Sequence, residues 1–226
     1  MKSLTKYLNE KLVIFPSQVN EKLVIFPSQV DEKSSIFPSQ VDEKLVINKD
    51  YKSPYTCAPK SWLELRKIIT DRYDKLGPGT KQKPIDFNDV DVSNIDSFYN
   101  NCTGLFERAK FKYIDLSDWN VSNVKDTSFM FSYCNHLKSV GALSNWSVSN
   151  VKFMNDMFYG CKQLKSIGDL SNWDVSKVEN ISFMFYKCKQ LESVGDLSKW
   201  KVSKVKYMRD MFKESGITNI PEWYIE

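Results

Sequence analysis

The sequence predicts an α/β repeat solenoid of about five coils, each with a short helix and a short parallel strand. The stretch LSNWSVSNVKFMNDMFYGCKQLKSIGD begins at Leu143, and related copies begin at Leu116, Leu170 and Leu197. Self-similarity at a fixed period of roughly 20–50 residues is typical of stacked repeats. Two aromatic columns share a spacing of 27 residues: Trp119, Trp146, Trp173 and Trp200, and Phe131, Phe158, Phe185 and Phe212.

The repeats divide the chain into three parts. Residues 1–52 are expected to form an N-terminal arm, residues 53–85 a capping-helix region, and residues 86–226 the solenoid. A degenerate first copy of the repeat lies at Asp86 to Tyr113. With 42% hydrophobic and 27% charged residues, the composition fits an ordinary soluble protein, and the net charge of +4 is too small to indicate a nucleic-acid binder.

The arm carries a second repeat with a period of 11 residues. NEKLVIFPSQV occurs at Asn9 and again at Asn20, and related units begin at Asp31 and Asp42. A proline after each of the first three apolar runs stops a strand from continuing. We expect a tandem array of docking motifs that add strands to a partner's sheet edge, rather than a packed miniature sheet. A duplication without function remains the alternative. The candidate tether residues are Leu12, Val13, Ile14, Phe15, Leu23, Val24, Ile25, Phe26, Ile36 and Phe37.

The segment from Lys60 to Leu76 has the clearest helical pattern in the chain. Ser61 is the predicted N-cap, Glu64 completes a capping box three residues later, and Gly77 ends the helix. The first coil of a solenoid exposes its core unless something covers it, so we interpret this helix as the cap. A helix lying on a membrane is the rival interpretation, but acidic side chains share its polar face.

Each coil is predicted to contain one helix and one strand. Met157, Cys161 and Leu164 stand at i, i+4 and i+7, which is the buried stripe of a short helix. Gly168 interrupts that pattern, and a short strand is expected in or around Lys165 to Trp173. The tryptophan and phenylalanine columns are expected to face inward as the structural core, because one coil cannot bury them alone.

The repeat also resembles a known family. The string L-S-x-W-x-V-S-N-V-x(5)-M-F-x-x-C-x-x-L-x-S-[VI]-G is similar to the repeat of BspA-like leucine-rich-repeat proteins, the bacterial surface protein and mycoplasma lipoprotein-associated group. The resemblance covers about Phe87 to Ile220. It implies a leucine-rich-repeat-like solenoid used for attachment and protein binding, and a possible phage-encoded member.

The start of the chain bears on localisation. Charged residues near Glu10 interrupt any apolar run before a secretory signal can form, and no run approaches the length of a membrane span. We therefore expect the bacterial cytoplasm or a phage virion, with the cell surface as the alternative.

Nothing in the sequence has the spacing of a catalytic, cofactor or metal site. The cysteines in the repeat lack the paired spacing of zinc ligands, so buried thiols are expected at Cys134, Cys161 and Cys188. The acidic cluster does not match a calcium loop and is interpreted as a solvated turn face. The repeated serines lack a nearby base, since the single histidine is His136. We therefore expect no enzyme, no cofactor and no metal.

Positions that differ between copies are the candidates for binding, because the constant positions build the core. A merely solvated polar surface is the competing interpretation. The candidate binding face consists of Asp118, Asn120, Asn145, Ser147, Asn172, Asp174, Lys199, Lys201, Lys138, Lys165 and Glu192.

The expected function is a non-enzymatic protein–protein interaction scaffold. Its arm would tether it to a larger assembly, either a phage virion or the bacterial envelope. A receptor- or glycan-binding adhesin is the alternative, because exposed aromatic side chains can stack on sugars. Nucleic-acid binding through the basic C-terminal coil is a weaker alternative, and it would require a steep salt dependence.

Overall fold

The computed structural model describes residues 57–225 and two short strands nearer the N-terminus, and the chain divides into two compact units, Met1–Ser53 and Pro54–Glu226. In the first unit, β1 (Val24–Ile25) pairs in parallel with β2 (Val46–Ile47). Two copies of the same apolar run are therefore aligned. The other candidate tether residues lie outside the described residues: Leu12, Val13, Ile14, Phe15, Leu23, Phe26, Ile36 and Phe37.

The second unit begins with helix α2 (Trp62–Leu76). The Ser61 hydroxyl accepts a hydrogen bond from the Glu64 N–H at 3.2 Å, and the Glu64 carboxylate accepts one from the Lys60 N–H at 2.7 Å. These bonds satisfy two amide groups at the start of the helix. Gly77 ends it with a φ of 74° and donates its N–H to the Tyr73 carbonyl. A left-handed φ of this kind favours glycine at the end of a helix.

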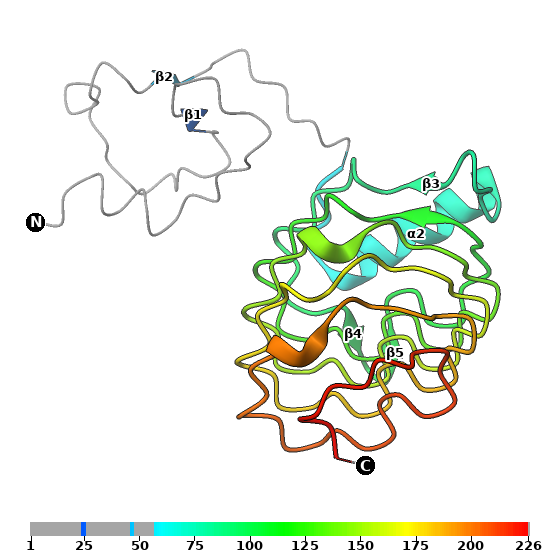
Figure 1. Cartoon of the computed structure of the whole chain (residues 1–226). Coiled ribbons are helices and arrows are strands. Elements are labelled where there is room, and N and C mark those ends of the chain that lie inside the picture. The colour runs from blue at the N-terminus through cyan, green and yellow to red at the C-terminus, as the bar shows by residue number, and fades with distance from the viewer. Residues whose placement is uncertain (1–23, 26–45, 48–56, 226) are drawn as a thin grey trace, which may run out of the picture. The chain divides into compact units, whose positions relative to one another are not determined.

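Helix α2 covers the first coil. Its Leu65 and Ile69 side chains are buried in the core. Its polar side chains donate to main-chain carbonyls of the coil: Trp62 Nε1 to Phe98, Arg66 to Leu105, and Arg72 to Asp86. Figure 1 shows α2 at the same end of this unit as β3, with the red C-terminal segment at the other end. The helix thus supplies hydrogen-bond donors where there is no preceding coil.

Five coils follow, which we number by their residues: coil 1 (86–115), coil 2 (116–142), coil 3 (143–169), coil 4 (170–196) and coil 5 (197–225). The first contact is parallel, between β3 (Ile85–Asp86) and β6 (Ile114–Asp115). Coil 1 also holds the antiparallel pair β4 (Tyr99–Asn100) and β5 (Thr103–Gly104), and 3-10 turns lie at η4 (Leu143–Asn145) and η5 (Leu197–Lys199).

Isolated parallel bridges connect the later coils in two columns. One column consists of Tyr113, Ser139 and Ser166, and the other of Ser97, Asp126, Phe153, Asn180 and Tyr207. Figure 1 shows the coils as successive layers that run from green to red. The pairing holds neighbouring copies of the repeat side by side along this unit.

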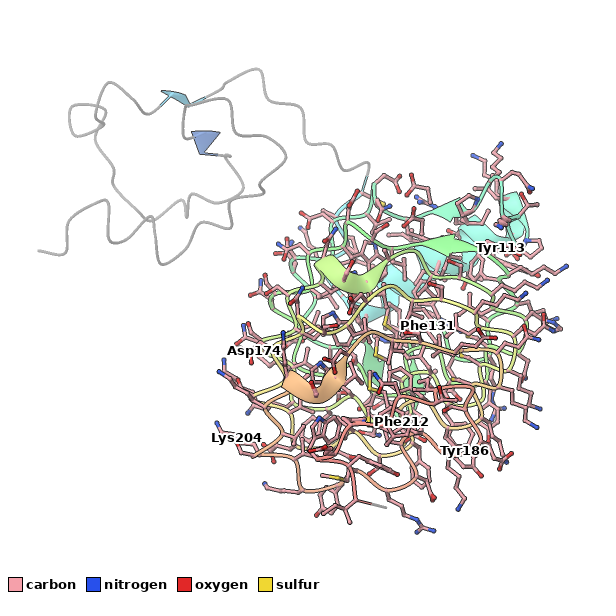
Figure 2. All side chains as sticks on the ribbon, viewed as in Figure 1. Tyr113, Phe131, Asp174, Tyr186, Lys204 and Phe212 are labelled. Carbon is pink, nitrogen blue, oxygen red and sulfur yellow. The ribbon has the colours of Figure 1, made fainter. Side chains whose placement is uncertain are left out.

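The phenylalanine column is buried and continuous from coil to coil. Successive ring centroids lie 5.2 Å apart between Phe131 and Phe158, and 5.9 Å apart from Phe158 to Phe185 and from Phe185 to Phe212. Figure 2 shows Phe131 and Phe212 in the interior. The column therefore runs through coils 2 to 5.

The tryptophan column is bonded as well as packed. The Trp146 indole N–H donates to the Leu116 carbonyl at 2.9 Å, and the tryptophans of coils 4 and 5 repeat this bond to the coil before them. The buried thiol of Cys161 likewise donates to the Phe131 carbonyl at 3.0 Å, and burial raises its pKa. Each of these side chains satisfies a buried carbonyl of a neighbouring coil.

The expected short helix is absent from coils 2 to 5 of the described chain, and turns take its place. In coil 3, Asp156 and Gly160 have φ values of 57° and 71°, which no α-helix accommodates. Alternate N–H groups here, such as those of Asp156 and Phe158, bond across to the next coil, and those of Met157 and Tyr159 bond to the carbonyl three residues back. The expected strand is likewise reduced, within coil 3, to the single bridge at Ser166. The leucine-rich-repeat-like class stays a prediction.

The stack closes at its C-terminal end without a helix. The Trp223 ring stacks on Trp200 at 6.2 Å and donates its indole N–H to the Leu197 carbonyl at 2.7 Å. Tyr224 packs edge-on against Phe212 at 5.1 Å. Two rings thus cover the ends of the two aromatic columns.

We expect Trp146→Ala to lower the free energy of unfolding by about 3–5 kcal/mol, because it empties a buried aromatic site. Trp146→Phe keeps a ring but leaves the Leu116 carbonyl without its donor, and should cost about 1–3 kcal/mol. Urea unfolding measures both values. The exposed neighbour supplies the control, and Asn145→Ala should change stability by less than about 0.5 kcal/mol. An unchanged midpoint for Trp146→Ala would contradict the role of the column.

Candidate functional site

The turns that replace the predicted helices carry the most distinctive surface of the coils. We call residues 127–133, 154–160, 181–187 and 208–214 the turn segments of coils 2 to 5. Within them, Met157 and Phe158 are fully buried, whereas Tyr159 is only partly buried. Tyr159, the first of the two residues between the Phe and Cys positions, therefore reaches the outside of the coil.

Three tyrosines form a ladder across coils 2, 3 and 4. The ring centroids of Tyr133 and Tyr159 lie 4.9 Å apart, and those of Tyr159 and Tyr186 are also 4.9 Å apart. Phe183 meets Tyr186 edge-on at 5.7 Å. We call Tyr133, Tyr159, Phe183 and Tyr186 the aromatic surface. Figure 2 places Tyr186 on the side of the unit opposite Asp174.

A glycine makes room for the first rung of the ladder. Tyr133 lies 27 residues before Gly160 rather than before a tyrosine, yet its ring contacts the ring of Tyr159 at an interplanar angle of 58°. A side chain at Gly160 would place its Cβ 3.3 Å from the Tyr133 ring, and the backbone there has a φ of +71°. Both facts favour glycine at this position.

Cations lie over the rings of the aromatic surface. The Arg108 guanidinium carbon is 5.5 Å from the Tyr133 centroid, the Lys187 ammonium is 4.8 Å from that of Tyr186, and the Arg209 guanidinium carbon is 5.9 Å from that of Phe183. Cations at these distances are attracted to the ring faces. Hydrogen bonding to Tyr186 raises the pKa of Lys187. Each cation also pairs with a carboxylate, Arg108 with Glu107, Lys187 with Glu214 and Arg209 with Asp210, so the surface is aromatic in its middle and surrounded by ion pairs.

An open depression of about 430 Å³ adjoins the ladder at Tyr133. Its lining combines basic groups, an amide and one aromatic ring, contributed by Arg108, Ala109, Lys110, Tyr133, Asn135 and His136. Such a lining could receive a carboxylate or a small acidic group.

The residues of the candidate binding face fall into two separate groups. The first group flanks the tryptophans at equivalent positions of the repeat: Asp118, Asn120, Asn145, Ser147, Asn172, Asp174, Lys199 and Lys201. Figure 2 labels Asp174 of this group. The second group is Lys138, Lys165 and Glu192, of which the two lysines each precede a residue of the bridge column Tyr113, Ser139 and Ser166. The Lys138 ammonium lies 6.0 Å from the Tyr113 ring centroid, and Lys165 donates its N–H to the Lys138 carbonyl. Figure 2 shows Tyr113 on the opposite side from Asp174.

Some of these polar residues stabilise turns. Asn120 accepts a hydrogen bond from the Ser122 N–H, and Asp174 accepts one from the Ser176 N–H. The bonds from Ser176 lower the pKa of Asp174. Asp86 and Asp91 of the acidic cluster accept from N–H groups two residues on, and Asp89 pairs with Arg72. Local geometry therefore accounts for side chains that also qualified as binding candidates.

The aromatic surface was missed in the sequence, although a signal was present. The strings MFSYC, MFYGC and MFYKC each place a tyrosine between the Phe and Cys columns. On the predicted helix these tyrosines would project from separate turns with no reason to meet. Only the extended turn segments bring the rings into contact.

Within the described part of the chain, no three His, Cys, Asp or Glu side chains are arranged to hold a metal ion. No helix among those residues is both long and apolar enough to cross a membrane.

Comparison with known proteins gives one match. The model of a family described as "Mycoplasma protein of unknown function, DUF285" matches residues 85–223, which is most of the coil stack. No curated protein and no solved structure matches the chain.

The ladder should be visible in a pH titration. Hydrogen bonding with Tyr133 raises the pKa of Tyr159 from 10.0 to about 12. Because the folded value lies above the unfolded one, this stabilisation is complete below pH 10.0 and is lost as the pH rises through about 12. The difference in tyrosinate absorbance between the unsubstituted chain and Tyr159→Phe isolates this phenol. Tyr133→Phe should return its pKa toward 10, and a pKa near 10 in the unsubstituted chain would contradict the assigned contact.

Proposed function

This chain belongs to the DUF285 family of Mycoplasma proteins of unknown function, and on that premise we propose that it is a non-enzymatic protein-interaction module. The observation that carries the proposal is the aromatic surface with its overlying cations. Tyrosine and arginine are enriched at protein interfaces and among the residues that dominate binding energy. Rings that already contact one another lose little conformational freedom when a partner binds.

The ring contacts favour a protein partner over a stacked sugar. Tyr159 has Tyr133 on one side and Tyr186 on the other, both at 4.9 Å. Cations lie over the outer rings, Arg108 over Tyr133 and Lys187 over Tyr186. The ladder therefore presents ring edges and hydroxyls, which suit the mixed apolar and polar surface of a protein.

A glycan-binding adhesin is the second candidate. The depression beside Tyr133 favours it, since Arg108 and Lys110 could receive the carboxylate of an acidic sugar. Here one sugar would bind in the depression rather than along the ladder.

We also propose that the repeats are of the BspA-like, leucine-rich-repeat-like class, in a phage virion or at the bacterial surface. The support is the repeated L-S-x-W string and the matched family. In this proposal the coils present a binding surface, and the 11-residue array tethers the chain to the assembly.

Photo-crosslinking tests the module. We expect p-benzoylphenylalanine in place of Tyr186 to crosslink to a protein in extracts of the native host, and the same substitution of Asn172, on the opposite side, to give no such product. Once the crosslinked protein is purified, Tyr186→Ala should weaken its binding by about 2 kcal/mol or more. Equal crosslinking from both positions would overturn the proposed surface. Acidic sugars bound on a glycan array and lost in Arg108→Gln, with no protein crosslink, would replace the module with the adhesin.

Deletion of residues 1–52 tests the tether. We expect the shortened chain to keep the unfolding midpoint of the full chain, because Met1–Ser53 forms its own compact unit, and to separate from the assembly on a density gradient. Multiplied weak motifs act through effective concentration, so removing one unit of the array should give an intermediate loss. Unchanged co-sedimentation of the deletion variant would remove the tether from the proposal.

A further inference from the structure

The main-chain hydrogen bonds between turn segments all run in one direction. In coil 2, the N–H groups donate to carbonyls of coil 3, from Thr127, Phe129, Phe131 and Tyr133 to Phe153, Asn155, Met157 and Tyr159. In coil 3, the donors are Met154, Asp156, Phe158 and Gly160, and in coil 4 they are Ile181, Phe183, Phe185 and Lys187. The turn segments of coils 2, 3 and 4 therefore each accept from the coil before them and donate to the coil after them.

Coil 5 has the same arrangement of donors, and the described residues that follow its turn segment do not accept from them. The equivalent groups are the N–H of Met208, Asp210, Phe212 and Glu214, and no acceptor among residues 57–225 bonds to them. Asp210 and Glu214 keep the positive φ values, 52° and 56°, that orient the donors in earlier coils. Alternate N–H groups left unpaired in a row form an open edge like that of a sheet. We call this row the donor edge.

The residues that follow coil 5's turn segment leave the path of the coils. Trp223 occupies the next place in the tryptophan column although it follows Trp200 by only 23 residues. Together with Tyr224 it covers the ends of the aromatic columns. Neither residue accepts a hydrogen bond from the N–H groups of the donor edge.

The charge of this coil indicates what would bind the donor edge. Residues 197–216 contain six basic and two acidic side chains, whereas the equivalent residues of coil 4, 170–189, contain three basic and two acidic ones. Arg209 and Lys213 belong to the turn segment itself, and both pair with Asp210. The donors and the surrounding charge both favour an acidic partner.

A second copy of this chain does not complement the donor edge. Two donor edges brought together by a two-fold axis would place N–H against N–H. At the other end of the stack, carbonyls of coil 1 already accept from α2, through Trp62, Arg66 and Arg72. A head-to-tail contact would have to displace that helix.

We propose that the donor edge binds an extended acidic segment of a partner protein, whose carbonyl oxygens accept from the N–H groups of Met208, Asp210, Phe212 and Glu214. The bound segment takes the place of a sixth coil, in the mode by which peptides extend an open edge. Its acidic side chains lie against the basic side chains of coil 5. The donor edge adjoins the aromatic surface, because the Tyr186 hydroxyl donates to the Glu214 carboxylate at 3.3 Å and the Arg209 guanidinium lies over Phe183. Tyr133 belongs to coil 2, so Tyr133→Ala should leave the interaction unchanged.

Amide hydrogen exchange on the ¹⁵N-labelled full chain tests the proposal, with a blocked Glu-Val alternating peptide of about ten residues as the probe. In the free chain, the four donor-edge amides should exchange at least about tenfold faster than their equivalents Met154, Asp156, Phe158 and Gly160. Saturating peptide should slow the donor-edge amides by about tenfold and leave the coil 3 set unchanged. Peptide binding that leaves the donor-edge amides fast would overturn the proposal.

Two further probes separate a peptide from a polyanion. A Lys-Val alternating peptide should not protect the donor edge, and a DNA duplex of about the same length should not protect it either. Equal protection by the duplex would overturn the proposal in favour of nucleic acid. Lys213→Gln should weaken Glu-Val peptide binding by about two- to fivefold. Lys162→Gln in coil 3 is the matched control, because Lys162 is also exposed. An equal loss of peptide affinity in Lys162→Gln would show only general charge attraction and would overturn the proposal.

Discussion

The structure depends on a ladder of main-chain hydrogen bonds between the turn segments of neighbouring coils, all of which run in one direction. Each turn segment turns its carbonyls toward the preceding coil and its N–H groups toward the next one, as in the bond from Phe158 to Met184. A buried peptide group without a partner is costly, so the ladder requires that every coil have a neighbour on both sides. The two ends of the stack therefore pose different chemical problems, one of acceptors and one of donors.

The first end is closed by matching donors to acceptors. Helix α2 presents Trp62, Arg66 and Arg72 to carbonyls of coil 1 while it buries Leu65 and Ile69. At the other end only the side-chain columns are closed, by Trp223 and Tyr224. The two ends differ because of the direction of the ladder. A covering segment must supply hydrogen-bond donors to the carbonyls at the first end and acceptors to the N–H groups at the last end.

The same ladder explains the aromatic surface. Because the turn segments are held in register from coil to coil, a residue that points outward in one coil stands beside its counterpart in the next. Tyr159 and Tyr186 meet in this way at 4.9 Å. In the interior, the repetition forms the phenylalanine and tryptophan columns. On the surface, it aligns the side chains at equivalent positions of neighbouring coils, whatever those side chains are. The outward-facing side chains can thus change without disturbing the core.

The sequence alone determined which side chains are buried, because a residue repeated every 27 positions returns to the same place in each coil. Trp146 and Phe158 are buried for this reason. The helix cap at Ser61 and Glu64 could also be predicted from the sequence, because the two residues that form it are three positions apart. Only the tertiary structure decided the backbone between them. The spacing of Met157, Cys161 and Leu164 predicts a helix, since periodicity counts side chains on one segment and contains no information on partners in another coil. Here those partners accept the N–H groups first, so the segment forms turns. The contact between tyrosines, the place of Trp223 and the donor edge all follow from that choice of partner.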